Sequence, residues 1–311
     1  MGIYDSSNKK LKYNLILHKL IKAHNDYVTS ISILPSGKMI SISTDKSINI
    51  YDINYNIEQK LQNAHNYCIN SLSIKDEENF ATCSSDNSIK TWIKKENKYI
   101  LNKKILNAHD NVIWNVIYNI KGNLFSCSSD NTIKIWEEKN NNYQLILTLN
   151  NLESVKTLLL IESKNKLISS GLEGTKIWNL NNYELIKYFK KAKCGWYKAL
   201  NKINEDKIIV GFSEWGGPYF FIVISISKLE ILFEISLPFY CFSITVIHNK
   251  EILIISGESK DLLIYNYNNF EFIQSINNLH DDRISGCIGL KNGLIASFSW
   301  DKTIKIWSLK E

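Results

Sequence analysis

Hydrophobic and polar residues alternate along most of this chain in short runs separated by turn-forming residues. Near the start, residues 28–34, 38–43, 47–53 and 57–62 show the pattern, and Asp45 lies in one of the turns. Successive side chains of a strand point to opposite faces of a sheet, so alternation over such short runs is typical of strands with one buried face. The pattern predicts four short strands in this stretch.

One set of residues recurs at a fixed spacing. A histidine is followed after 21 residues by an aspartate and after 27 residues by a tryptophan or tyrosine. This arrangement occurs without gaps four times, in residues 24–51, 65–92, 109–136 and 280–307. Self-similarity at one period is the signature of a repeat architecture.

The closing aromatic residues extend the period over the chain. These residues are Tyr51, Trp92, Trp136, Trp178, Tyr265 and Trp307, and successive members are 41, 44, 42, 87 and 42 residues apart. The step of 87 equals two periods, so one further unit with an eroded motif lies between residues 179 and 222. Seven units of four short strands predict the blades of a β-propeller.

The repeats resemble the WD-repeat (WD40) family, most closely in residues 84–92, 128–136 and 299–307, which are nearly interchangeable. The resemblance implies an all-β, seven-bladed propeller of four-stranded antiparallel blades that forms a single domain over residues 1–311. The expected blades are residues 22–62, 63–106, 107–149, 150–189, 190–235, 236–276, and 277–311 together with 11–20. Two departures are that Ala or Leu replaces the glycine before each motif histidine, and that units 4 to 6 are eroded.

The two ends of the chain predict how the ring closes. The sequence stops four residues after Trp307, which leaves the last unit without an outer strand. Residues 11–20 are strand-like and belong to no unit. We expect this N-terminal segment to complete the last blade, which removes an open sheet edge.

The repeated histidines and aspartates have two interpretations, a catalytic triad and a structural device. A catalytic site is built once per domain, whereas this arrangement appears once per unit, with Ser or Thr two and four residues before each Asp. In the family, such residues form a hydrogen-bonded tetrad inside each blade. The expected tetrad residues are His24, Asp45, His65, Asp86, Trp92, His109, Asp130, Trp136, His280, Asp301 and Trp307.

Other kinds of active site have no matching motif in this sequence. His18 and His248 lack partners at metal-ligand spacing, and residues 213–218 contain two glycines without a phosphate-binding lysine. We therefore predict that the protein is not an enzyme and that it needs no metal and no other cofactor.

The family resemblance implies a partner-binding surface on the face that carries the Asp turns. Its contact positions lie three and five residues after the motif histidine and one before the motif aspartate. They include Tyr27, Trp114, Arg283 and Trp300. If the register of units 5 and 6 holds, Trp215 of unit 5 and either Tyr240 or Phe242 of unit 6 join them. Trp, Tyr and Arg dominate binding hot spots. The alternative is that these rings plug the channel or pack one blade against the next.

Charge and cysteine usage narrow the class of partner. The formal net charge is +6, and Arg283 is the only arginine among 37 cations. Lysine cannot reproduce the bidentate guanidinium contact to phosphate, so no nucleic-acid partner is expected. Six cysteines without a C-x-x-C pair and a polar N-terminus predict a reduced, cytoplasmic protein, with a nuclear location also open.

The function predicted from these features is a non-enzymatic scaffold or adaptor that binds a protein or peptide as a subunit of a larger complex. Two alternatives remain open. Met1-Gly2 with Ser6 fits N-myristoylation, which would make the protein a peripheral membrane propeller, and membrane contact is expected only if Gly2 is lipidated. The second alternative is a substrate-recruiting subunit of a ubiquitin ligase complex.

Overall fold

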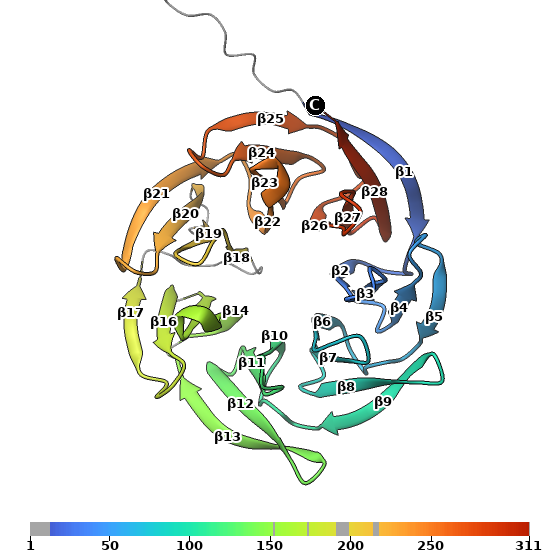
Figure 1. Cartoon of the computed structure of the whole chain (residues 1–311), viewed down its shortest axis with the longest axis vertical. Helices are drawn as coiled ribbons and strands as arrows, with labels where there is room; N and C mark the ends of the chain where they lie inside the picture. Colours follow the sequence, from blue (N-terminus) through green and yellow to red (C-terminus); the bar gives the residue numbers. More distant parts are fainter. Residues whose placement is uncertain (1–12, 152, 173, 191–198, 214–217, 311) are drawn as a thin grey trace, which may run out of the picture.

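The computed structural model of the protein describes residues 13–151, 153–172, 174–190, 199–213 and 218–310. Seven four-stranded antiparallel sheets stand around a common centre and form a closed ring (Figure 1). The sequence prediction of a seven-bladed all-β propeller is therefore confirmed.

Each of the first three blades is built from four consecutive strands, counted from the centre of the ring outward. Blade 1 contains β2 (Val28–Ile33), β3 (Met39–Ser43), β4 (Ile48–Tyr51) and β5 (Ile57–Leu61). Blade 2 contains β6 (Ile69–Ile74), β7 (Asn79–Ser84), β8 (Ile89–Lys95) and β9 (Lys98–Ile105). Blade 3 contains β10 (Ile113–Tyr118), β11 (Leu124–Ser128), β12 (Thr132–Lys139) and β13 (Asn142–Asn150).

The next three blades follow the same order. Blade 4 contains β14 (Val155–Ile161), β15 (Lys166–Gly171), β16 (Thr175–Asn179) and β17 (Leu185–Phe189). Blade 5 contains β18 (Leu200–Lys202), β19 (Lys207–Ser213), β20 (Tyr219–Ser225) and β21 (Glu230–Leu237). Blade 6 contains β22 (Cys241–Ile247), β23 (Ile252–Gly257), β24 (Leu262–Asn266) and β25 (Phe272–Ile276). Two 3-10 turns, η1 (Glu162–Lys164) and η2 (His248–Lys250), join the first two strands of blades 4 and 6. The last strand of blade 5 ends at Leu237, two residues beyond the boundary expected from the sequence.

Both ends of the chain contribute to the seventh blade. Its strands are β26 (Ile284–Gly289), β27 (Ile295–Ser299) and β28 (Thr303–Lys310), and β1 (Asn14–Lys22) pairs with β28 as the outer strand. The N-terminal strand thus closes the ring as predicted, although it covers residues 14–22 rather than 11–20. Tyr13 is also clasped by blade 6, since its backbone N–H donates to Gln274 Oε1 at 2.8 Å and its carbonyl accepts from Gln274 Nε2 at 2.6 Å.

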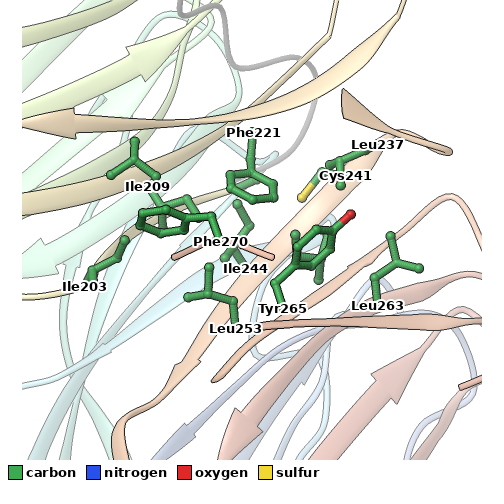
Figure 2. Close-up of a cluster of buried hydrophobic side chains, with 13 residues drawn as sticks. Ile203, Ile209, Phe221, Leu237, Cys241, Ile244, Leu253, Leu263, Tyr265 and Phe270 are labelled. Carbon is green, nitrogen blue, oxygen red and sulfur yellow. The ribbon is translucent and has the colours of Figure 1, made fainter. Parts of the chain in front are cut away.

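Burial along the strands explains the sequence pattern. The second strand of each blade lies between neighbouring blades, and all five residues of β3 and of β11 are buried. The residues of the outer strands β5 and β17 are exposed or partly buried, except for buried Phe189 at the end of β17. Apolar clusters fill the spaces between adjacent blades, and Figure 2 shows the largest of them, with Phe221, Tyr265 and Phe270 between blades 5 and 6.

Candidate functional site

The repeated histidine and aspartate lie side by side in four blades. In blade 3, His109 Nδ1 is 2.7 Å from Asp130 Oδ2, and His109 Nε2 is 2.7 Å from Ser126 Oγ. Trp136 Nε1 donates to the same Ser126 hydroxyl at 2.9 Å. An ionised carboxylate only accepts, so Nδ1 carries the proton and Nε2 accepts the hydroxyl proton of Ser126. Each of these polar side-chain atoms therefore has a hydrogen-bond partner within the network.

The other three networks repeat this geometry with small substitutions. Their histidine-to-aspartate distances are 3.2 Å for His24 and Asp45, 3.0 Å for His65 and Asp86, and 2.7 Å for His280 and Asp301. Trp92 and Trp307 donate to Thr82 and Ser297, whereas in blade 1 the Tyr51 hydroxyl lies 3.0 Å from Ser41 Oγ. The network thus recurs around the ring, as a structural device does.

The tetrad carboxylates are ionised, although they are largely buried. Burial alone would raise the pKa of Asp86 and of Asp130. For Asp86, hydrogen bonds from His65, Ser88 and the backbone outweigh the effect of burial. For Asp130, hydrogen bonds from His109, Thr132 and the backbone do the same. The pKa of each carboxyl group therefore falls well below its usual range. Burial lowers the pKa of His65 and His109 in spite of the neighbouring carboxylates. Each of these pairs is therefore a neutral imidazole beside a negative carboxylate at pH 7.

A lysine two residues before the closing aromatic adds a contact that the sequence analysis missed. Lys90, Lys134 and Lys305 donate to the carbonyl oxygens of Ala64, Ala108 and Leu279, which precede the motif histidines. Asn49 donates to Ala23 in the same way. The Ile-Lys-x-Trp sequence recurs at residues 89–92, 133–136 and 304–307, and a cation at the same place in three repeats indicated a shared acceptor.

One end of the ring collects the loops that enter each inner strand and the turns that contain the motif aspartates. Strands in a blade are antiparallel, so the connections after the second and the fourth strand lie at the same end. We call this end the Asp-turn face. In six blades a register shift near the start of the inner strand leaves one extra residue at this end, and these residues are Thr29, Asn70, Trp114, Lys156, Phe242 and Ser285.

This bulge explains the second contact position implied by the resemblance. A bulge turns one additional side chain out of the strand pairing and re-aims it. The extra residue lies five positions after the motif histidine, as Thr29, Trp114 and Ser285 show. In blade 6 the bulged residue is Phe242, which gives the register that the sequence analysis left open.

Aromatic side chains from blades 6, 7 and 1 form a continuous stack on the Asp-turn face. The ring centroids of Tyr27 and Trp300 are 4.6 Å apart at 13°, and those of Trp300 and Phe242 are 5.8 Å apart at 22°. Tyr240 continues the row edge-on to Phe242. Tyr27 is 37% exposed, whereas Phe242 is buried. The stack therefore joins three blades and leaves part of Tyr27 exposed to solvent.

The single arginine of the chain lies against this stack. The guanidinium carbon of Arg283 is 4.8 Å from the Trp300 ring centroid, and its Nη2 is 2.8 Å from Glu258 Oε1. Both charged side chains are about two-fifths exposed, at 41% and 42%. A planar guanidinium can stack on an indole ring and bind a carboxylate at the same time.

Trp114 belongs to a different group of side chains on the same face. Its indole Nε1 donates to Ser129 Oγ at 2.6 Å, and Lys156 Nζ lies 3.8 Å from the Trp114 ring centroid. Lys156 is almost completely buried. Trp114 therefore covers a buried cation, which gives this ring a packing role within blades 3 and 4. Trp215 lies outside the described residues, as do Trp196 and Tyr197.

Other contact positions are used to join neighbouring blades. The Thr29 hydroxyl donates to the Ile69 carbonyl at 2.7 Å, and Asn70 Nδ2 donates to the Ile113 carbonyl at 2.9 Å. The inner strands β2, β18, β22 and β26 surround a hollow of about 360 Å³. Within the described part of the chain no group of three His, Cys, Asp or Glu side chains could hold a metal ion.

Comparison with known proteins agrees with this geometry. The family model described as WD domain, G-beta repeat matches residues 15–52, 57–92, 101–137 and 273–308. No curated protein matches the chain. Together with the seven-bladed ring, the four matched repeats show that the chain belongs to the WD40-repeat family of β-propellers.

The matched segments coincide with the four blades that carry a complete tetrad, with the N-terminal strand included in the first. WD40 propellers are in general non-catalytic scaffolds that mediate contacts between proteins. Over the described residues, no helix is long and apolar enough to cross a membrane.

Proposed function

We propose that this protein is a non-enzymatic scaffold or adaptor that binds a protein or peptide partner on the Asp-turn face, as one subunit of a larger complex. The observation that carries the proposal is the stack of Tyr27, Trp300 and Phe242 with Arg283 beside it. These residues come from three blades and meet on the Asp-turn face.

The composition of this surface supports a protein partner. Interface hot spots are enriched in Trp, Tyr and Arg because such side chains cover a large area with little loss of rotamer freedom. Trp300 stacks with Tyr27 and with Phe242, and Arg283 lies over Trp300, so little ordering would be needed on binding.

The best variants to test the proposal are the exposed members of the stack. Trp300 and Trp114 also pack blade against blade or cover Lys156, so their loss would weaken the ring itself. We therefore choose Tyr27→Ala/Arg283→Ala as the site variant. The matched control is Leu185→Ala/Lys187→Ala on outer strand β17, which also removes one exposed apolar side chain and one exposed cation.

Both variants and the wild-type protein would be used as bait in an affinity pulldown from the native cell type, after their melting temperatures have been matched. We expect partners to be retained by the control and lost from the site variant. Partners that survive in the site variant and disappear from the control would place recognition on the rim and refute the proposed surface.

A further inference from the structure

The outer strands of blades 7, 1 and 2 form one continuous surface on the rim of the ring. Strands β1, β5 and β9 follow one another around this rim (Figure 1). Lys19 Nζ of β1 donates to the Asn54 carbonyl oxygen at 2.8 Å, and Gln59 of β5 exchanges two hydrogen bonds with the backbone of Tyr99 in β9. We call these three strands, with the flanking residues 52–56, 96–97 and 106, the 7-1-2 rim.

Large apolar side chains are exposed along the 7-1-2 rim. The eight that are exposed there are Ile16, Leu17, Leu20, Ile53, Ile57, Ile100, Leu101 and Leu106. The described residues of blades 4, 5 and 6 together expose three, which are Leu185, Phe233 and Phe272.

The fold itself accounts for one such side chain in most blades. Leu17, Ile57 and Leu101 lie opposite the closing aromatic residues of blades 7, 1 and 2, as Leu185 and Phe272 do in blades 4 and 6. The others on the 7-1-2 rim have no such role, and three of them are at least half exposed, with exposed fractions of 50% for Leu20, 60% for Ile53 and 68% for Leu106. This rim therefore shows more apolar surface than the propeller fold requires.

Lysine residues are concentrated on the same strands. Strands β1, β5 and β9 contain six lysines and one carboxylate, Glu58, and the turns before β5 and β9 add Asp52 and Glu96. Lys19 and Lys103 contact the next blade, and the four exposed lysines are Lys22, Lys60, Lys98 and Lys104. Strands β21 and β25 contain no lysine and two carboxylates.

The charges of whole blades show the same asymmetry. Blades 7, 1 and 2 carry 17 cations and 12 carboxylates over residues 13–108 and 280–310. Blades 5 and 6 carry five cations and eight carboxylates over residues 199–213 and 218–276. The positive character of this side of the ring therefore does not depend on which loops are assigned to the rim.

Edge protection does not explain these lysines. Lysine on an exposed edge strand discourages pairing with other chains. However, β13, β21 and β25 are also the outermost strands of their blades, and none of the three contains a lysine. The lysines of β1, β5 and β9 therefore need another reason.

The composition of the 7-1-2 rim favours a lipid surface over a protein. Protein interfaces concentrate Trp, Tyr and Arg, whereas the exposed side chains on this rim are Ile, Leu and Lys. Binding to an anionic bilayer grows with buried apolar area and with the number of cations near the headgroups, which need no bidentate geometry. Lys9, Lys10 and Lys12 also precede β1 in the sequence.

We propose that the 7-1-2 rim docks on the surface of a bilayer that contains anionic lipids. Leu20, Ile53 and Leu106 contact the boundary between headgroups and acyl chains, and Lys22, Lys60 and Lys104 lie beside the anionic headgroups. The inference goes beyond the proposed function, because it assigns a second surface that differs from the Asp-turn face. It also differs from the expectation drawn from the sequence, since it needs no lipid chain on Gly2.

The experiment is co-sedimentation of the full chain with vesicles of phosphatidylcholine and phosphatidylserine in equal parts, and with vesicles of phosphatidylcholine alone. The protein is produced in bacteria, so that no myristoyl chain is attached to Gly2. The cation variant is Lys22→Gln/Lys60→Gln/Lys104→Gln, and the apolar variant is Leu20→Ser/Ile53→Ser/Leu106→Ser. The control, Lys139→Gln/Lys187→Gln/Lys228→Gln, removes three exposed lysines from blades 3, 4 and 5. All variants are first checked for unchanged melting temperature.

We expect the wild-type protein and the control to bind the mixed vesicles equally and the pure phosphatidylcholine vesicles weakly. The cation variant should bind the mixed vesicles on the order of tenfold more weakly, because each lysine near an anionic surface strengthens binding several-fold. The apolar variant should also bind more weakly, and added salt should weaken binding of the wild type.

Three results would overturn the inference. Equal loss in the control and the cation variant would show a general effect of net charge. Full binding by both rim variants would place the lipid contact elsewhere, as would the absence of any binding to the mixed vesicles. Binding of polyglutamate by a protein that leaves the vesicles unbound would identify an acidic protein as the occupant of this rim.

The outcome can be separated from that of the proposed function. The Tyr27→Ala/Arg283→Ala variant should lose its protein partners and still bind the mixed vesicles. A protein that keeps its partners after the loss of Lys22, Lys60 and Lys104 but no longer binds vesicles would support two independent surfaces.

Discussion

Blades 1, 2, 3 and 7 are held by hydrogen-bonded tetrads, whereas blades 5 and 6 have apolar side chains at the positions of the tetrad serine or threonine and of the lysine that accompanies the tetrad. The serine or threonine of the tetrad, Ser126 in blade 3, is replaced by Val210 in blade 5 and by Ile255 in blade 6. The lysine two residues before the closing aromatic becomes Ile222 or Leu263. These two positions change together in both blades.

The difference shows that blades 5 and 6 lose the buried hydroxyl and the neighbouring lysine of the network together. Each polar atom left without a partner in a blade would cost about 1–3 kcal/mol, so a partly replaced tetrad is worse than either complete solution. Phe221, Tyr265 and Phe270 supply apolar contact area in blades 5 and 6 in place of hydrogen bonds (Figure 2).

Blade 4 keeps part of the tetrad network and leaves one buried polar atom without a partner. Trp178 still donates to Ser169 at 2.9 Å, but Asn151 occupies the histidine position. Lys176 donates to Asn151 Oδ1, while Asn151 Nδ2 is buried without a hydrogen-bond partner. A small cavity opens beside these residues.

The largest expected effect is the loss of one tetrad histidine. His109→Ala removes one partner each from the ionised Asp130 carboxylate and the buried Ser126 hydroxyl and should lower the free energy of unfolding by about 3–5 kcal/mol. The apolar blades should tolerate substitution better, and Ile255→Val in blade 6 should lower the free energy of unfolding by about 1 kcal/mol. Urea unfolding of the two variants measures both values, and equal costs would contradict the distinction between the blades.

Acidification should weaken the tetrad blades. The pKa values of His65, His109 and the tetrad aspartates are lowered in the folded protein, so the unfolded chain binds more protons and stability falls with decreasing pH. The loss should begin below about pH 6.5 for the histidines and continue below about pH 4 for the aspartates. A urea midpoint that stays constant from pH 7.5 to pH 5 would contradict the neutral state of the buried histidines.

A smaller effect is expected at the junction between the two kinds of blade. Gln274 of apolar blade 6 holds the backbone of Tyr13, which directly precedes the outer strand β1 of tetrad blade 7. Gln274→Ala should reduce the free energy of unfolding by about 1–2 kcal/mol because it removes two hydrogen bonds. Gln144→Ala on exposed β13 serves as the control, and equal melting temperatures for the two variants would refute the role of the clasp.

The smallest effect concerns the turn residue after each tetrad aspartate. This residue is left-handed in all four tetrad blades, with φ of 69° at Lys46, 62° at Asn87, 68° at Asn131 and 71° at Lys302. Asparagine tolerates this conformation better than lysine, so Lys302→Asn should stabilise the ring by roughly 0.5 kcal/mol and Asn131→Lys should destabilise it similarly. Thermal melts of both variants check the sign, and a stabilising Asn131→Lys would contradict the argument.

The fold was predictable from the sequence because the repeats carry it directly. Histidine, aspartate and tryptophan at fixed spacing mark the tetrad blades, and the leftover strand at the N-terminus predicted the closure. Blade 5 gave no such signal, since Ile224 stands where the other blades have a closing Trp or Tyr. Its existence followed only from the double step in the period.

The surface features depended on geometry that spacing does not encode. Trp114 and Trp300 were predicted as equivalent contact residues, yet one covers buried Lys156 and the other joins three blades in a stack.

The most direct test of the central claim is hydrogen exchange of the protein with and without its captured partner. If the partner binds the Asp-turn face, slowed exchange should be confined to residues 23–27, 277–283 and 300–302 and the turns beside them. Protection limited to the outer strands, or to the loops at the opposite end of the ring, would contradict the account.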